Sequence, residues 1–229
     1  MAYSELVESL KGKLIVSVQA YPGEPMRHPE TMAQIARACE LGGAAAIRCQ
    51  GLSDISAIKG RVEIPVIGLW KEGHEGVYIT PTLRHARACI HAGADVVALD
   101  ATDRLRPDGR TFEETVATLR TESDVLIMAD CMTMDDIRRA VAAGCDLVST
   151  TLSHNKAAID TTLDDGPDIA LLQQATTEFP GIAIICEGHV HTPQDAKDAL
   201  DAGAWAVVSG TAITHPTSIT SWFAAALED

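Results

Sequence analysis

Lys71 and Glu187 are the two residues of this chain whose types and positions most directly suggest acid–base chemistry. Lys71 ends the apolar segment PVIGLWK (65–71), and Glu187 comes near the end of IAIICEG (182–188). An ionised group is costly to bury without a partner, so each side chain either meets water or belongs to a functional site. A lysine and a glutamate on opposite faces of a carbon atom can remove a proton from one face and deliver one to the other, which inverts that carbon.

Two other interpretations of this pair stay open from the residues alone. Lys71 could form a Schiff base with a carbonyl substrate, as lysines of some aldolases do. Lys71 and Glu187 could also form a structural ion pair that takes no part in chemistry. All three interpretations use the same two positions and differ only in what the lysine does.

Two glycine-containing segments, EGHVHTP (187–193) and SGTAITHP (209–216), could bind a phosphate group. Gly188 and Gly210 let the backbone approach an anion closely, and Thr211 adds a hydroxyl beside backbone amides. The two histidines of HVH could instead begin a metal site. Zinc takes three or four ligands, however, and no second histidine motif ends a neighbouring segment, so we expect no metal.

Eight short apolar segments, rich in β-branched residues and bounded by Gly or Pro, must position these groups. They are LIVSVQ (14–19), AAAIRCQ (44–50), PVIGLWK (65–71), DVVALDA (95–101), DVLIMAD (124–130), DLVSTT (146–151), IAIICEG (182–188) and WAVVSG (205–210). Continuous apolar segments of this length are typical of parallel strands covered on both faces. Capped helical patterns separate them, such as the one between Thr133 as N-cap and Gly144 as its end. Two connections, 71–81 and 152–167, are long enough to serve as lids.

A repeated phrase supports a closed barrel. A helix-ending glycine precedes a strand at four places about fifty residues apart, which is the length of two strand–helix units: Gly43, Gly93, Gly144 and Gly203. Eight alternating strands and helices in 229 residues predict an α/β fold of the (β/α)8 TIM-barrel type, with residues 1–229 as a single domain. The rival is a doubly wound sheet, which has a glycine-rich fingerprint after its first strand; AYPGEPMRHP (20–29) is no such fingerprint.

Polar residues at the ends of the other strands belong to the same expected site. Catalytic groups of such barrels lie at the C-terminal strand ends, where they converge on one mouth. We therefore expect a substrate to bind at that mouth among the strand-end groups Gln19, Arg48, Lys71, Asp100, Asp130, Thr150, Glu187 and Gly210. In a ring of eight strands the third and seventh face each other across the axis, which would place Lys71 and Glu187 on opposite sides of a substrate.

Composition excludes several other functions. The net charge of −14 repels nucleic acid and anionic lipid, so we expect neither as a partner. The sequence shows no signal peptide and no apolar run near the ~20 residues of a membrane span. Its six cysteines form no CxxC pair, which indicates reduced core cysteines in a cytoplasmic protein.

Taken together, these motifs resemble the N-acetylmannosamine-6-phosphate 2-epimerase family, NanE. The resemblance covers nearly the whole chain and is carried by LIVSVQAYPGEP (14–25), PVIGLWK (65–71), VYITPT (77–82), GADVVALDAT (93–102), LIMADC (126–131), DLVSTTLS (146–153), CEGHVHTP (186–193) and TAITHP (211–216). It implies an isomerase of sialic acid catabolism that interconverts N-acetylmannosamine 6-phosphate and N-acetylglucosamine 6-phosphate by inversion at C2, without metal or organic cofactor. It also implies that Lys71 and Glu187 are the acid–base catalysts. Gln19, Arg48 and Asp130 match family positions that contact the sugar and the developing oxyanion.

The phosphate-binding segments depart from the family pattern. His189 and His215 stand where the family commonly has arginine, and Thr211 replaces a glycine. Arginine carries a permanent charge, whereas histidine is charged only in part near neutral pH, so these departures bear on the phosphate affinity and on the exact substrate. Two alternative functions stay open beside the epimerase: a Schiff-base aldolase or lyase on a sugar phosphate, and a non-catalytic sugar-phosphate binder.

Two terminal segments could join copies of the chain into a homodimer. They are YSELVESLKGK (3–13) and SITSWFAAAL (218–227), through Leu6, Trp222 and Phe223. The alternative is that these apolar residues only close the bottom of the barrel.

Overall fold

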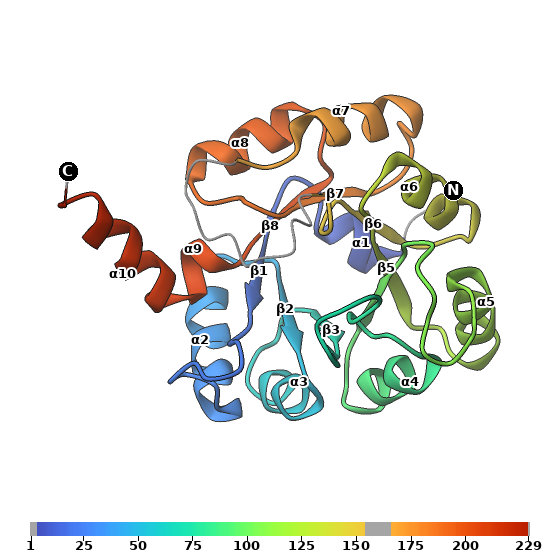
Figure 1. Ribbon diagram of the computed structural model, residues 1–229, viewed down its shortest axis with the longest axis horizontal. Coiled ribbons are helices and arrows are strands. Elements are labelled where there is room, and N and C mark those ends of the chain that lie inside the picture. Colours follow the sequence, from blue (N-terminus) through green and yellow to red (C-terminus); the bar gives the residue numbers. More distant parts are fainter. Residues whose placement is uncertain (1–3, 154–165, 229) are drawn as a thin grey trace.

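The computed structural model describes residues 4–153 and 166–228, which form a closed barrel of eight parallel strands surrounded by helices (Figure 1). The strands pair in sequence order and β8 closes the ring against β1. Their bounds are β1 (Leu14–Val18), β2 (Ala46–Gln50), β3 (Val66–Leu69), β4 (Val96–Asp100), β5 (Leu126–Asp130), β6 (Leu147–Ser149), β7 (Ile184–Glu187) and β8 (Ala206–Ser209). The predicted (β/α)8 barrel is therefore confirmed.

The helices begin where the capping residues predict. Thr133 and Thr192 each cap a helix by accepting a hydrogen bond from a backbone N–H three residues on, and an aspartate at that position bonds back to the cap. The helices are α1 (Glu5–Ser9), α2 (Pro29–Leu41), α3 (Leu52–Lys59), α4 (Leu83–His91), α5 (Phe112–Glu122), α6 (Met134–Ala142), α7 (Ile169–Glu178), α8 (Pro193–Asp201), α9 (Thr211–Thr214) and α10 (Pro216–Ala225). None of these described helices is long and apolar enough to cross a membrane.

The core has two layers, because strand side chains alternate between the inside of the barrel and the space under the helices. In β7, Ile185 belongs to the inner layer and Cys186 to the outer one, so Glu187 faces inward. In β6, Leu147 is likewise inner and Val148 outer. This alternation decides which strand-end side chains reach the inside of the barrel.

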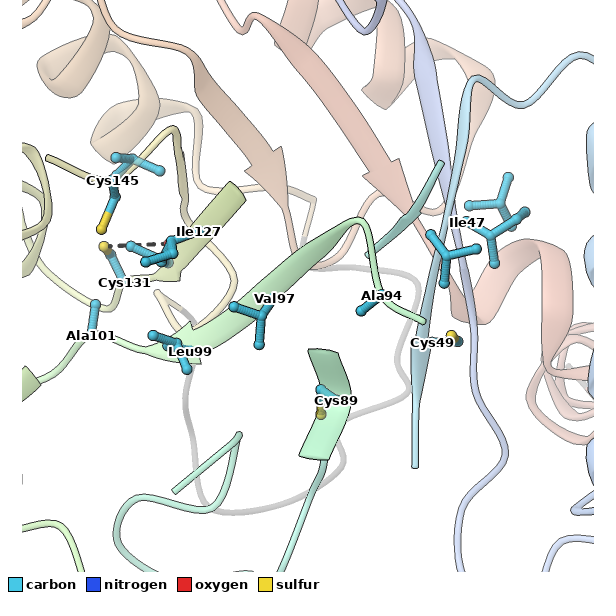
Figure 2. Packing of buried hydrophobic residues seen from close by; sticks show 14 of the residues in the cluster. Ile47, Cys49, Cys89, Ala94, Val97, Leu99, Ala101, Ile127, Cys131 and Cys145 are labelled. Atoms are coloured by element: carbon cyan, nitrogen blue, oxygen red, sulfur yellow. Dashed lines mark hydrogen bonds between the residues drawn. The ribbon is translucent and has the colours of Figure 1, made fainter. Parts of the chain in front are cut away.

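Cysteines and aliphatic side chains fill much of the outer layer. Figure 2 shows part of it, where Cys89, Cys131 and Cys145 lie among residues such as Val97 and Ile127. All six cysteines are free, five of them buried and Cys39 half-buried. The expectation of unpaired core cysteines is confirmed.

The two terminal segments have different positions. Helix α1 closes one end of the barrel: Val7 and Leu10 pack into the inner layer, and the indole N–H of Trp205 donates to the carbonyl of Val7 at 2.9 Å. Helix α10 instead extends away from the barrel (Figure 1), and Phe223 is 72% exposed. Only α1, with Leu6 packed against the inner layer, therefore closes the barrel as the alternative predicted.

The connection after β3, predicted to be a lid (71–81), folds as a hairpin. Lys71 pairs with Ile79 in an antiparallel bridge, and the N–H of Thr80 donates to the carbonyl of Trp70 at 2.8 Å. This pairing extends β3 and holds the backbone of Lys71 above the barrel. The second predicted lid, 152–167, lies largely outside the described residues.

Candidate active site

A cavity of about 220 Å³ opens at the C-terminal ends of the strands. Most of the predicted site residues line it: Gln19, Arg48, Lys71, Glu187, Gly188, His189, Gly210, Thr211 and His215. Asp130 and Thr150 do not. The structure thus brings together residues that lie up to 196 positions apart in the sequence, from Gln19 to His215.

Lys71 and Glu187 reach this cavity from strands four places apart in a ring of eight, hence from opposite walls. Burial and the positive charge of Arg48 lower the pKa of Lys71 to about 8, against the opposing charges of Glu187 and Asp130. The Lys71 ammonium also lies 5.7 Å from the centre of the Tyr21 ring, a cation–π distance. A lysine with this pKa has a neutral, proton-accepting form near physiological pH.

Arg48 is the centre of the charge network. Its guanidinium is 2% exposed and donates to Oε1 of Glu187 and, at 2.5 Å, to Oδ2 of Asp130. A buried cation is tolerated only when partners satisfy it, and two carboxylates do so here. Arg48 also lines the cavity, so it can meet a negative charge that develops on a substrate.

Asp130 lies below the cavity, fully buried at the end of β5. Burial raises its pKa to about 7, the charge of Glu187 adds to that rise, and the charge of Arg48 opposes it. The structure therefore places Asp130 behind Arg48, where it can act on a substrate through the guanidinium.

Thr150 is turned away from the cavity. Its hydroxyl donates to the carbonyl of Glu187 at 3.0 Å and accepts from the Glu187 N–H at 3.1 Å, so it holds the end of β7 in place. The inward side chain is that of Thr151, because Leu147, Ser149 and Thr151 share one face of the chain. The structure thus corrects the expectation for Thr150: Thr151 lines the cavity and Thr150 does not. Alternation along β6 predicts that Thr150 and Thr151 face opposite ways, but both faces of this segment are apolar, so the sequence does not tell which of the two turns inward.

The histidines of the predicted phosphate site sit on the cavity wall with distinct partners. His215 shares a hydrogen bond with the Ser218 hydroxyl through Nδ1 at 2.6 Å, and its Nε2 lies 3.3 Å from a carboxylate oxygen of Glu24. His189 has a positive φ of 55° and its ring lies 5.6 Å from that of His191. Burial, with the neighbouring charge of His189, lowers the pKa of His191.

Sequence reasoning missed several residues of the cavity wall. They are Ser17, Tyr21, Tyr78, Thr151, His191 and Thr214. The rings of Tyr21 and His215 form a T-shaped contact with their centres 5.1 Å apart, and burial raises the pKa of the Tyr21 phenol. Tyr21 and Glu24 both stand in AYPGEP (20–25), a polar loop after a strand, which is where barrel sites lie. Within the described ranges, no group of three or more His, Cys, Asp or Glu side chains is arranged to hold a metal ion.

The fold is a closed parallel barrel with a polar cavity at one end. A lysine of lowered pKa and an arginine held by two carboxylates lie at that cavity, and this combination is typical of a barrel enzyme that uses acid–base chemistry. Residues 32–229 match the family model described as "Putative N-acetylmannosamine-6-phosphate epimerase", NanE. The chain belongs to this NanE family, as the sequence motifs predicted.

Individual relatives are similar to this chain along nearly its whole length. A Cutibacterium acnes protein named "Putative N-acetylmannosamine-6-phosphate 2-epimerase" is 57% identical over 97% of this chain and 96% of its own. A relative of the same name from Caldanaerobacter subterraneus is 44% identical over 96% of this chain and 92% of its own. The solved N-acetylmannosamine-6-phosphate 2-epimerase from Clostridium perfringens superimposes with a TM-score of 0.88 at 36% identity, covering 98% of this chain and 97% of that one.

Proposed function

We propose that this chain interconverts N-acetylmannosamine 6-phosphate and N-acetylglucosamine 6-phosphate by removing and returning the proton at C2, in amino sugar and sialic acid catabolism. The family relationship supports the substrates. The observation that carries the chemistry is that Lys71 and Glu187 face one cavity from opposite walls, beside a buried arginine. In the open-chain sugar, C2 lies next to the C1 aldehyde, so its proton is acidic because an enolate can form.

The site residues have complementary roles in this proposal. Lys71, with a pKa of about 8, is neutral in about one molecule in ten at pH 7 and takes the C2 proton in that form. Arg48 stabilises the negative charge that builds up on O1. Glu187 delivers a proton to the opposite face of C2, and the two residues exchange roles in the reverse direction. This chemistry requires no metal or organic cofactor.

The phosphate group would lie at the ends of β7 and β8. Gly188 and Gly210 open the backbone there, and the hydroxyl of Thr211 faces the same cavity. His189 and His215, which stand where the family commonly has arginine, line the same cavity. Gln19, whose amide oxygen is buried without a described partner, is placed to receive a hydrogen bond from the sugar.

Proton NMR of N-acetylmannosamine 6-phosphate incubated with the protein in D2O tests this function. The expected result is formation of N-acetylglucosamine 6-phosphate, with loss of the C2 proton signal from both sugars as deuterium enters. Absence of turnover, or product that keeps the original C2 proton, would contradict the proposal.

The lowered pKa of Lys71 would also suit a lysine that forms a Schiff base, so an aldolase or lyase is a second candidate function. Treatment with borohydride in the presence of the substrate would trap a Schiff base as a covalent adduct. Mass spectrometry should find no adduct on Lys71 if the chain is an epimerase. An adduct there would support an aldolase or lyase instead.

We also propose that the chain acts in the cytoplasm as a homodimer joined through α10. The six free cysteines support a reducing compartment. Phe223 in the projecting helix and Leu227 just after it are exposed at 72% and 87%. Light scattering should find a dimer that the double variant F223D/L227D converts to a monomer. The variant L105D changes an equally exposed leucine on another loop and should remain dimeric. A monomeric wild-type chain would contradict the dimer.

A further inference from the structure

Four side chains form a closed hydrogen-bonded ring at the base of the cavity. Arg48 binds one oxygen of Asp130 and one oxygen of Glu187. The hydroxyl of Thr151 binds the other oxygen of each carboxylate, at 2.9 Å from Oδ1 of Asp130 and 3.0 Å from Oε2 of Glu187. Each carboxylate therefore has one oxygen on the guanidinium and the other on the Thr151 hydroxyl, and Oε2 of Glu187 also lies 3.4 Å from Oγ of Ser149.

The hydroxyl groups do not carry enough protons for these contacts. Thr151 also lies 2.7 Å from the hydroxyl oxygen of Ser149, which makes three oxygen–oxygen contacts of hydrogen-bond length around one atom. A hydroxyl group has one proton to donate, so Thr151 and Ser149 supply two between them. A third proton, carried by one of the two carboxyl groups and donated to Thr151, satisfies all three contacts.

We propose that Asp130 and Glu187 share one proton through the hydroxyl of Thr151, so that the pair stores the proton that Glu187 delivers to the substrate. This inference rests on the proposed function for its use in catalysis, but not for the existence of the shared proton. Thr151 and Asp130 are positioning residues in this scheme, because they act on the substrate through Glu187.

The charges around the pair favour one retained proton. Arg48 from β2 and Lys71 from the end of β3 stabilise the ionised carboxylates, whereas Asp100 from β4 disfavours a second negative charge near Asp130. Arg48 is the charged group in direct contact, and one guanidinium balances one carboxylate. Burial raises the pKa of Asp130 to about 7, in agreement with this count.

The proton balance of one turnover follows. Neutral Lys71 takes a proton from C2 and becomes an ammonium ion, while Glu187 gives its proton to the opposite face of C2. Before that step, a proton held on Asp130 reaches Glu187 because Thr151 donates its own proton to Glu187 and accepts the one from Asp130. After the step both carboxylates are ionised and the Lys71 ammonium ion balances the added negative charge. Lys71 then releases its proton to solvent and the carboxyl pair takes one up, which restores the starting state with no net gain or loss of protons.

Infrared spectroscopy of the substrate-free chain at neutral pH tests the shared proton. The C=O band of protonated carboxyl groups should lose the same intensity in Asp130→Asn and in Glu187→Gln, because either change leaves one carboxylate for one guanidinium. Asp95→Asn is the control, since Asp95 is paired with Lys59 at 2.6 Å outside the cavity and its removal should leave the band intact. Intensity lost in only one of the two test variants, or in neither, would overturn the proposal. This measurement needs no substrate, so its result does not depend on whether the proposed function is correct.

Kinetics test the path through Thr151. Thr151→Val keeps the side-chain shape without the hydroxyl and should lower kcat about tenfold or more, since it removes a hydrogen bond to a charged group. Thr151→Ser restores the hydroxyl and should recover most of that rate. Thr115→Val removes another buried hydroxyl, one that bonds the carbonyl of Thr111 in α5, and is the matched control. A Thr151→Val variant as fast as the control, or a serine variant as slow as the valine one, would overturn the path.

Discussion

The carboxylate of Glu187 is bound to the guanidinium of Arg48 rather than to the ammonium of Lys71, although Lys71 and Glu187 line the same cavity. The structural ion pair between lysine and glutamate, one interpretation of the sequence, is therefore not what forms among the described residues. Because no described carboxylate lies within ion-pair distance of Lys71, burial and Arg48 can lower its pKa to about 8. The pairing of Glu187 is thus what leaves a proton-accepting lysine in the cavity.

Replacing Lys71 by alanine should reduce epimerisation by about 10²- to 10⁴-fold, the usual loss for an acid–base group. Steady-state rates in both directions measure it, and thermal unfolding should show that the fold persists. Lys13→Ala removes an exposed lysine outside the cavity and is the control. A Lys71→Ala variant that keeps the wild-type rate would show that another residue takes the proton.

The variant Glu187→Gln distinguishes a mechanism with two catalytic residues from a mechanism in which Lys71 acts alone. If Lys71 and Glu187 work on opposite faces, the variant should lose epimerisation by about 10²- to 10⁴-fold, yet Lys71 should still exchange the C2 proton of one epimer with solvent. NMR in D2O, begun separately from each epimer, distinguishes these processes. Epimerisation at the wild-type rate would show that Lys71 acts alone.

The lowered pKa of Lys71 predicts a link between pH and stability. The folded chain has a lysine pKa of about 8 and the unfolded chain one near the ordinary 10.5, so the unfolded state binds more protons between these values. The contribution of Lys71 to the free energy of unfolding should therefore rise as pH increases from about 8 to about 10.5. Below pH 8 the charged lysine costs stability in full, so Lys71→Met should raise the free energy of unfolding at pH 7 by about 1 kcal/mol or more while abolishing activity. Denaturant unfolding of both proteins at pH 7 and 10.5 measures this, and an equal stability difference at the two pH values would contradict it.

Glu24→Gln should weaken substrate binding through His215. The carboxylate of Glu24 lies 3.3 Å from Nε2 of His215 and also accepts a hydrogen bond from Thr217 at 2.8 Å, so it orients the imidazole at the proposed phosphate site. We expect KM to rise about tenfold with a smaller effect on kcat, the cost of one hydrogen bond to a charged group. Steady-state kinetics with Glu30→Gln, an exposed glutamate paired with Arg61 outside the site, as control would check this. A change confined to kcat would contradict a binding role.

The hydrophobic pattern was sufficient to predict the barrel and the end of the barrel at which its site lies. Apolar segments bounded by glycine and capped helices place the eight strands, and a closed ring then requires that the ends of β3 and β7 face each other. The residue type at the end of each strand is also written in the sequence. For this reason the sequence alone assigns Lys71, Glu187 and Arg48 to one cavity.

What the sequence determined alone was therefore the order of the elements and the set of polar groups at their ends. The tertiary structure decided which of these groups share a face and which charges they meet. Thr150 and Thr151 are adjacent and chemically identical, and only the register of β6 turns Thr151 inward. Likewise, Glu24 meets His215 across 191 positions of the chain. Such pairings depend on distances of a few ångströms between side chains from different strands and loops, which a local pattern of residues does not encode.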